Sequence, residues 1–302
     1  RLSVDERNLI LNNISPKEGT AYRSELGGII APNENYTGNP ARAVLIRVHN
    51  DPTMIAGFID AASTGKMDMI WSNERGITIN GNSGLVGRFG NVTLTTGRVS
   101  DDMTEILVRD GRLEINGSFN GKASESLSLL AREIRINSEL HANDLTVIGG
   151  EYDYNTGTKE VIKRGDNLDE VLISAVIVGS PYRNIYFKAV GSDLAVKGSL
   201  ISERVMSINA DGTLELERIQ SAENIDIKAE KFVQNGSTYA EGRLRIEAGS
   251  TVLNGLGTQA SEIEITGNLE NTNNIYSKGD VTVGGDVKNK GQLLSEGSLE
   301  VK

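Results

Sequence analysis

The chain has 302 residues, of which 38% are hydrophobic and 5% aromatic, and its formal net charge at pH 7 is −10. The absence of cysteine excludes disulfides, thiol catalysis and cysteine-ligated metal sites, and the two histidines, His49 and His141, argue against a histidine metal site or a Ser-His-Asp triad. The acidic balance argues against a nucleic-acid partner, and no long apolar stretch predicts a transmembrane helix.

Turn formers and strand formers alternate through the first hundred residues. Residues 72–99 read SNERGITINGNSGLVGRFGNVTLTTGRV, in which β-branched runs at 77–79 and 92–95 are separated by glycine and asparagine. This pattern predicts short strands joined by tight turns, without helices.

The middle of the chain continues this pattern with one interruption. Short strands are predicted at 113–115, 134–136 and 145–147, and the segment 124–132 (SESLSLLAR) lacks the apolar stripe of a helix. Residues 150–170 break the pattern, and the Asn155-Thr156-Gly157 sequence predicts a protruding hairpin there. Residues 171–178 are predicted to form the next apolar strand.

Two interleaved series of short apolar strands occupy the last third of the chain. The first begins at Ile225, Leu244, Ile263, Val281 and Leu299, with steps of 19, 19, 18 and 18 residues. The second comprises Leu194–Val196, Leu214–Leu216, Phe232-Val233, Val252-Leu253, Leu269 and Val287. A repeat of this length predicts a solenoid in which each coil stacks on the previous one.

The alternation within each strand predicts which side chains face inward. In Ile263-Glu264-Ile265 the isoleucines are expected to stack in the core while Glu264 faces solvent. The corners should need residues that tolerate positive φ; we assign this role to Gly249, Asn254, Gly255, Gly267, Asn268, Gly279, Gly284 and Gly285. The predicted fold is an all-β, right-handed parallel β-helix of about 19 residues per coil.

Several segments resemble a known family. Residues 8–15, 26–46, 55–60 and 70–97, with Asn33-Glu34-Asn35-Tyr36, Asn73-Glu74-Arg75-Gly76-Ile77 and Leu94-Thr95-Thr96-Gly97, are similar to the secretion domain of two-partner secretion exoproteins. Filamentous haemagglutinin and contact-dependent growth-inhibition effectors belong to that group. The resemblance covers residues 1–200, and residues 201–302 are similar to the β-helix repeats that follow the domain.

The chain departs from the family in its two signature turns. The family has Asn-Pro-Asn-Leu and Asn-Pro-Asn-Gly-Ile, whereas glutamate replaces proline at positions 34 and 74 and arginine stands at 75. A type I turn accepts glutamate at its second position, so the fold should survive. The signal and capping strands that usually begin the family's domain are not found in residues 1–302, so we expect a fragment or a trimmed chain.

The resemblance implies a role in export. Such domains are threaded unfolded from the periplasm through an outer-membrane barrel whose periplasmic modules bind them, and the β-helix forms outside the cell. The residues implied in this recognition are Asn33, Asn35, Asn73, Gly76 and Ile77; their other interpretation is as turns that stabilise the first coils. Replacement of the turn Gly267-Asn268 should be tolerated better, because stacked coils template it.

The resemblance also implies a larger setting. It implies a secreted or cell-surface exoprotein of a Gram-negative bacterium, transiently periplasmic: an adhesin, a haemagglutinin or a contact-dependent inhibition effector. Its partners would be the transporter and a host or target-cell receptor contacted through downstream regions. No cofactor, metal site, catalytic residue or nucleic acid is expected.

Two alternatives remain open. A β-helical phage or surface fibre shares the fold, and a carbohydrate-active β-helix enzyme would need carboxylates gathered on one face. The acidic residues fall mostly on outward-facing strand positions or in turns, where solubility is a sufficient explanation for them and no catalytic site is needed. The match of residues 255–260 to G-x-G-x-x-A is interpreted as a coil corner, because a strand and not a helix follows it.

Overall fold

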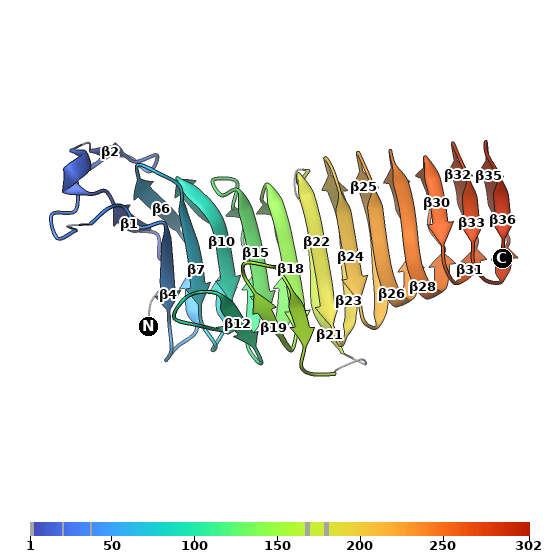
Figure 1. The fold of residues 1–302 in the computed structure, drawn as a ribbon, viewed down its shortest axis with the longest axis horizontal. Coiled ribbons are helices and arrows are strands. Elements are labelled where there is room, and N and C mark those ends of the chain that lie inside the picture. Colours follow the sequence, from blue (N-terminus) through green and yellow to red (C-terminus); the bar gives the residue numbers. More distant parts are fainter. Residues whose placement is uncertain (1–2, 20, 37, 167–169, 178–180) are drawn as a thin grey trace. The chain divides into compact units, whose positions relative to one another are not determined.

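A computed structural model describes residues 3–19, 21–36, 38–166, 170–177 and 181–302. The chain divides into two compact units, Arg1–Thr146 with Tyr152–Ile162, and Val147–Glu151 with Lys163–Lys302. Each unit is a parallel β-solenoid, which confirms the predicted fold class (Figure 1). Among the described residues the one helical element is the 3-10 turn η1 (Pro16–Glu18).

Three parallel strips of strands build the first unit. The first strip is β4 (Ala43–Arg47), β7 (Met67–Ser72), β10 (Phe89–Thr95) and β15 (Ser126–Ala131). The second is β5 (Thr53–Ile55), β8 (Ile77–Ile79), β13 (Arg112–Ile115) and β16 (Glu133–Ile136). The third is β1 (Leu9–Asn13), β6 (Phe58–Ser63), β9 (Ser83–Gly87), β14 (Phe119–Asn120) and β17 (Leu140–His141).

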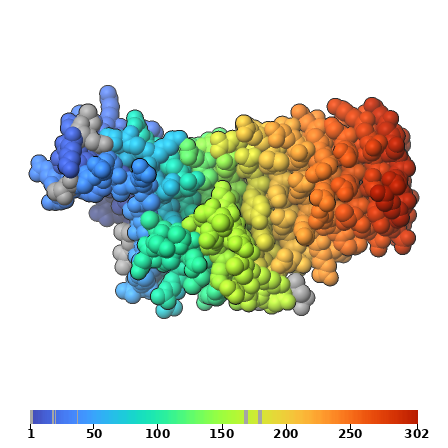
Figure 2. All heavy atoms as spheres, viewed as in Figure 1, coloured from blue at the N-terminus to red at the C-terminus, as the bar shows by residue number. Residues whose placement is uncertain are grey.

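Two hairpins stand outside these strips. The first is β2 (Tyr22–Arg23) with β3 (Ile29–Ile30). The second, β11 (Arg98–Val99) with β12 (Glu105–Val108), pairs antiparallel with β19 (Tyr152–Asn155), and β20 (Val161–Lys163) completes a four-stranded sheet. Residues 98–108 and 152–162 accordingly lie side by side on the surface in Figure 2.

The predicted hairpin near 150–170 is therefore confirmed, but its pairing with β12 was not predicted. Asn155 forms the turn, with its side-chain oxygen accepting from the amides of Gly157 and Thr158. The sequence did not indicate that residues 98–108 would pair with it, because the residues that form the contact are separated by about fifty positions. Residues 167–169 of the predicted segment lie outside the described residues.

The second unit repeats the three-strip plan. Its strands are β21 (Val171–Ile177), β22 (Asn184–Val190), β23 (Asp193–Ser202), β24 (Met206–Ala210), β25 (Thr213–Ser221), β26 (Ile225–Gln234), β27 (Ser237–Ala240), β28 (Arg243–Leu253), β29 (Gly257–Ala260), β30 (Glu262–Ile265), β31 (Asn268–Asn271), β32 (Asn274–Ser277), β33 (Val281–Val283), β34 (Val287–Asn289), β35 (Gln292–Ser295) and β36 (Leu299–Val301); β18 (Asp144–Gly150) spans the division between the units. Of the predicted strand 171–178, residue 178 lies outside the described residues.

The registers confirm the first predicted series. Ile225, Leu244, Ile263, Val281 and Leu299 pair in succession, each with the residue one coil further on. Ile263 and Ile265 are each 1% exposed, whereas Glu264 is half-exposed and forms an ion pair with Arg245. The predicted facing of this strand is therefore correct.

The second series is wrong by one residue in a single coil. Phe232 pairs with Thr251, which is fully buried, and Thr251 pairs with Leu269. The predicted spacing aligned Val252 with Phe232 and Leu269, but Thr251 occupies that register and Val252 faces outward. A threonine has nearly the shape of a valine, so a buried threonine can occupy a core column that a hydrophobic pattern assigns to its neighbour.

The expected reason for the corner glycines is also wrong. None of the glycines assigned to the corners of the second unit has a positive φ. At Gly255, Gly267, Gly279, Gly284 and Gly285, adjacent coils approach too closely for a side chain. A Cβ at Gly255 would lie 1.6 Å from the carbonyl oxygen of Gly236, and a Cβ at Gly267 would lie 2.0 Å from that of Ala248. The expectation that Gly267 tolerates replacement is therefore wrong as well.

We expect Gly255→Ala to destabilise the second unit by roughly 2–4 kcal/mol, because the added methyl group forces two stacked coils apart. Gly257→Ala is the matched control, since a Cβ there meets nothing nearer than 3.5 Å; its effect should stay within about 0.5 kcal/mol. The free energy of unfolding in denaturant measures both. Similar values for the two variants would contradict the close-approach explanation.

Candidate functional site

The second signature turn lies between β7 and β8. The amide of Gly76 donates to the carbonyl of Asn73 at 3.0 Å, which closes a four-residue turn, and the amide of Arg75 donates to the Asn73 side-chain oxygen at 2.9 Å. This is the self-capping geometry that the sequence predicted for an asparagine at the first turn position. Glutamate at the second position, Glu74, is exposed and leaves the turn intact.

Asn73 also connects two coils. Its side chain is fully buried, and its amide nitrogen donates to the carbonyl of Asp51 and to the hydroxyl of Thr53, both at 2.8 Å. Thr53 belongs to the preceding coil, and its own amide donates to the carbonyl of Gly76. Hydrogen bonds at Asn73 and at Gly76, the first and last residues of the turn, thus join it to the preceding coil. This role of Asn73 could not be read from the local sequence.

Gly76 and Ile77 carry the chain from the turn into the core. Gly76 has φ +115°, a backbone conformation that glycine adopts easily and residues with a side chain rarely do. A Cβ at this position would lie 3.0 Å from the carbonyl oxygen of Arg112. Ile77 is fully buried and pairs with Thr53 on one side and Leu113 on the other. These two residues set the entry of the second strip.

The first signature turn has the same local geometry in a different place. The amide of Tyr36 donates to the carbonyl of Asn33 at 2.9 Å, and the amide of Asn35 donates to the Asn33 side-chain oxygen at 3.2 Å. The amide of Asn33 also donates to the carbonyl of Ile14, just beyond β1. Asn35 itself is exposed. Among the described residues no hydrogen bond joins this turn to the one at Asn73, so the structure presents two separate turns.

Sequence reasoning missed Asn13, which fixes the segment between the first turn and β4. Its side chain is buried, donates to the carbonyl of Ala41 at 2.8 Å and to the hydroxyl of Ser63 at 3.0 Å, and accepts from the amide of Ala41. The available signal was a pair of asparagines at the end of an apolar strand (LILNN). A buried asparagine in such a position usually forms hydrogen bonds within the fold.

A buried carboxylate holds the β2–β3 hairpin against the first unit. Asp60 is fully buried and accepts hydrogen bonds from the hydroxyls of Ser24 and Tyr22. Burial, followed by the charge of Asp60 and the hydrogen bond to it, raises the pKa of Tyr22 to about 12. The Tyr22 hydroxyl therefore keeps its proton at neutral pH and can donate to Asp60.

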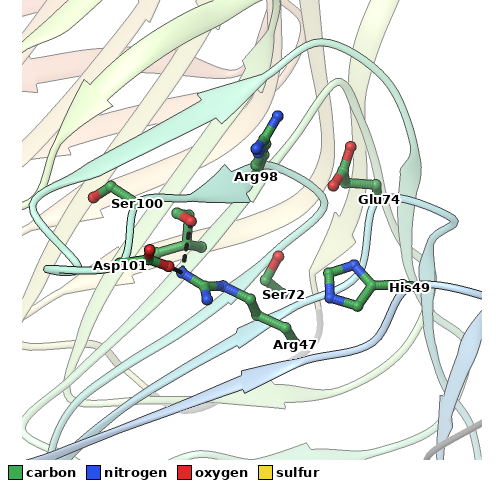
Figure 3. A pocket seen from close by; sticks show the side chains of 8 residues that line it. Arg47, His49, Ser72, Glu74, Arg98, Ser100 and Asp101 are labelled. Carbon is green, nitrogen blue, oxygen red and sulfur yellow. Dashed lines mark hydrogen bonds and ion pairs between the residues drawn. The ribbon is translucent and has the colours of Figure 1, made fainter.

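A polar hollow opens beside the second turn (Figure 3). The Arg47 guanidinium at the end of β4 donates to the carbonyl of Val99 at 3.0 Å and forms an ion pair with Asp101 at 2.8 Å. Within the described residues no ion pair engages Arg98. The remaining lining residues are His49, Ser72, Glu74 and Ser100.

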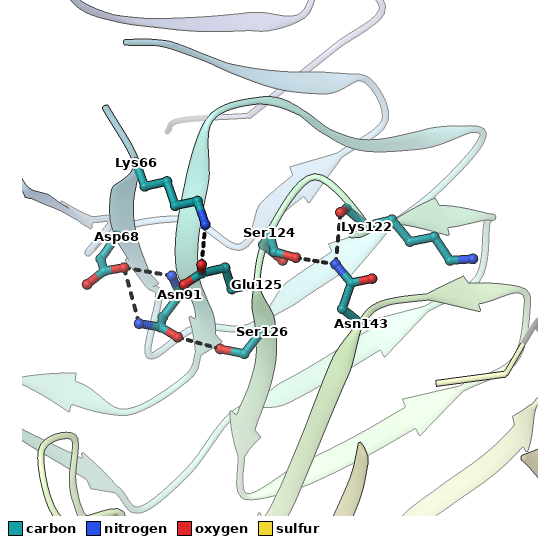
Figure 4. Close-up of polar contacts among 8 residues, drawn as sticks. All are labelled: Lys66, Asp68, Asn91, Lys122, Ser124, Glu125, Ser126 and Asn143. Carbon is teal, nitrogen blue, oxygen red and sulfur yellow. Dashed lines mark hydrogen bonds and ion pairs between the residues drawn. The ribbon is translucent and has the colours of Figure 1, made fainter. Parts of the chain in front are cut away.

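Polar ladders run across the coils on another part of the first unit (Figure 4). Asp68 accepts from the backbone and side-chain amides of Asn91, whose side-chain oxygen accepts from Ser126. Lys66 forms an ion pair with Glu125. All of these groups find partners in the protein, so the ladders serve coil-to-coil stacking.

The parts of the chain that the structure describes hold no group of three histidine, aspartate or glutamate side chains suited to a metal ion. They also contain no helix long and apolar enough to cross a membrane.

The chain is similar to known proteins over most of its length. The family model described as TPS secretion domain matches residues 2–216. Among curated proteins, "tRNA nuclease CdiA" of Escherichia coli (strain NC101) is 27% identical over 271 residues, which are 86% of this chain and 8% of the relative. The "16S rRNA endonuclease CdiA" of Enterobacter cloacae is 27% identical over 83% of this chain and 8% of its own length. The chain thus spans less than a tenth of these relatives.

A solved structure shares the fold. The filamentous hemagglutinin secretion domain superposes with a TM-score of 0.51 at 19% identity, covering 99% of this chain and 89% of the other. This likeness supports the solenoid architecture described above.

Proposed function

Because the chain belongs to the TPS secretion domain family, we propose that it directs the export of a larger exoprotein through a cognate outer-membrane transporter. The observation that supports this proposal is the match over residues 2–216, which includes both signature turns. The exported protein would be a surface or secreted adhesin, haemagglutinin or contact-dependent inhibition effector of a Gram-negative bacterium. Whatever activity the parent has would reside in its other parts.

We assign the recognition role to Asn33, Asn35, Asn73, Gly76 and Ile77. In the folded chain the side chains of Asn73 and Ile77 are buried, so a transporter would meet them while the chain is still unfolded. After export the same residues close the turns of the first coils. Recognition before folding and stabilisation after it are therefore compatible roles for one set of residues.

The fold offers a physical reason for movement outward. Each coil that forms outside the cell buries apolar side chains against the previous coil and extends the parallel ladders. A chain that has begun to fold outside is then held there. The role of the N-terminal turns would be to start this process at the right place.

The test is the dependence of secretion on the transporter. The parent protein should reach the medium or the cell surface when the cognate transporter is co-expressed, and remain in the periplasm when the transporter gene is deleted. A deletion of residues 2–216 from the parent should give the same periplasmic retention. Export that continues without the transporter would reject the proposed function.

A further inference from the structure

A row of outward-facing side chains crosses the third strip of the second unit. This strip consists of the C-terminal ends of β23 and β25, followed by β27, β29 and β32, which pair in parallel from one coil to the next (Figure 1). The residues before and after each central position are buried, so the central side chain points outward. The row, which we call the glutamine–tyrosine row, comprises Ile201, Gln220, Tyr239, Gln259 and Tyr276.

Most polar groups of this row have no partner within the fold. All five side chains are half-buried. Among the described residues, no hydrogen bond engages the side-chain amides of Gln220 and Gln259 or the hydroxyl of Tyr239. The hydroxyl of Tyr276 donates to the Glu296 carboxylate, which leaves its ring free. The row therefore holds two amides and a hydroxyl that are available to a ligand.

The row carries no charge, in contrast to the outward face of the first strip. On that face Arg243 forms an ion pair with Asp226. Arg245 forms ion pairs with Glu247 and Glu264. An ionic ligand on the glutamine–tyrosine row would give up water without meeting an opposite charge in the row. The composition of the row therefore favours a neutral ligand with many hydrogen-bonding groups.

The spacing of the two tyrosines favours a ligand with a regular repeat. Tyr239 and Tyr276 lie two coils apart, with Gln259 between them. Since neighbouring strands are about 4.8 Å apart, the two tyrosine positions are about 9.6 Å apart along the row. An extended β-1,4-linked glycan rotates each sugar by half a turn relative to the previous one. It therefore presents the same face at every second sugar, and the length of this repeat is close to the tyrosine spacing.

We propose that the glutamine–tyrosine row binds a neutral β-1,4-linked glycan that lies across the coils. The rings of Tyr239 and Tyr276 would stack on the apolar C–H faces of alternate sugars. The side-chain amide of Gln259, which both donates and accepts, would bind the hydroxyls of the sugar between them. The inference concerns the folded chain and goes beyond the proposed role in export.

The binding is tested by isothermal titration calorimetry of the 302-residue chain with cellohexaose and with chitohexaose. These two probes share the β-1,4 linkage and differ in the substituent on C2 of each sugar. We expect a Kd on the order of 0.1–1 mM for at least one of them, as suits a shallow face that excludes little water. Maltohexaose is the ligand control. Its α-1,4 linkage coils the chain, so it should bind about tenfold more weakly or worse.

The row itself is tested by Tyr239→Ala, which should weaken binding by about tenfold or more. Tyr239→Phe keeps the ring and should lose about threefold or less. Tyr186→Ala is the matched control, because Tyr186 is also a half-buried, outward-facing tyrosine but lies on β22 in the first strip. It should bind like the wild type. If Tyr239→Ala fails to fold by circular dichroism, Tyr276→Ala and Gln259→Ala decide, with expected losses of about tenfold and threefold.

The outcomes distinguish this inference from the alternatives. A wild-type chain that binds neither β-1,4 probe would overturn it, as would equal affinity for maltohexaose or equal binding of the wild type and the row variants. A wild-type dimer that Tyr239→Ala dissociates, with no glycan bound, would assign the row to self-association instead. Transporter-dependent secretion of a parent that carries Tyr239→Ala should match the wild type, so each inference can fail without the other.

Discussion

The double variant Asn73→Ala with Gly76→Ala is expected to abolish secretion of the parent protein through its transporter. Asn73 loses two donated hydrogen bonds and one accepted from the backbone, all of them in a fully buried position. Each such bond contributes about 1 kcal/mol, and the partners left unsatisfied add to the cost. Alanine at position 76 must adopt φ +115° and meets the carbonyl oxygen of Arg112 at 3.0 Å, which adds about 1 kcal/mol or more.

The consequence for export follows from the position of this turn. Without this turn, Ile77 is no longer held in register with β5. The hydrogen bond from the Asn73 side chain to the Thr53 hydroxyl, which connects the two coils, is also lost. The first coils then fail to form outside the cell. The measurement is the amount of parent protein in the medium, compared with the wild type at matched expression.

The chain offers a closely matched control for this experiment. Asn254 and Gly257 have the same spacing and also lie at a coil corner. Asn254 is exposed, and among the described residues no hydrogen bond engages its side chain; a Cβ at Gly257 meets nothing nearer than 3.5 Å. Asn254→Ala with Gly257→Ala should be secreted normally. Normal secretion of the Asn73/Gly76 variant would defeat the proposed role of the second turn.

Ile263→Asp should destabilise the second unit by roughly 3–5 kcal/mol, because it places an unpaired carboxylate in an apolar interior. Ile263 is 1% exposed and lies between Leu244 and Val281 in one column of the core. The neighbours of the aspartate in the column, Leu244 and Val281, offer it neither a cation nor a hydrogen-bonding side chain. Urea unfolding followed by circular dichroism measures the loss.

Glu264→Lys is the control on the adjacent residue. Glu264 is half-exposed, and its ion pair with Arg245 has a Nε–Oε2 distance of 3.3 Å. Exposed pairs of this kind contribute little, so the change should cost less than about 1 kcal/mol. Equal losses for the two variants would mean that the inward and outward faces of β30 are exchanged.

The repeat and the two asparagine turns were accessible from the sequence because they depend on local chemistry. A strand with an apolar-x-apolar pattern, recurring every 18 or 19 residues, reflects the two-residue period of a strand and the length of a coil. Asn33 and Asn73 cap their turns through hydrogen bonds to residues two positions on, which sequence alone specifies. The positive φ of Gly76 follows from the same local geometry.

The sequence analysis did not predict the third strip of the second unit, because one of its core columns contains threonine as well as isoleucine and leucine. Ile219, Thr238, Thr258, Ile275 and Leu293 pair in succession. Thr238 and Thr258 are buried. Because threonine is also common on protein surfaces, a search for apolar residues does not identify these two as core positions. Their place in the core is set by the hydrogen bonds between coils, which the sequence of one coil does not contain.

The sequence by itself thus determined the solenoid, its repeat length and the local form of its turns, because strand alternation and asparagine capping act over a few residues. Only the tertiary structure decided what lies one coil away. It showed that Gly255 is required by the carbonyl of Gly236, that Asn73 binds Thr53, and that residues 105–108 pair with 152–155. These features depend on distances between segments about 20 to 50 residues apart, which the stacking of coils sets and local propensity does not.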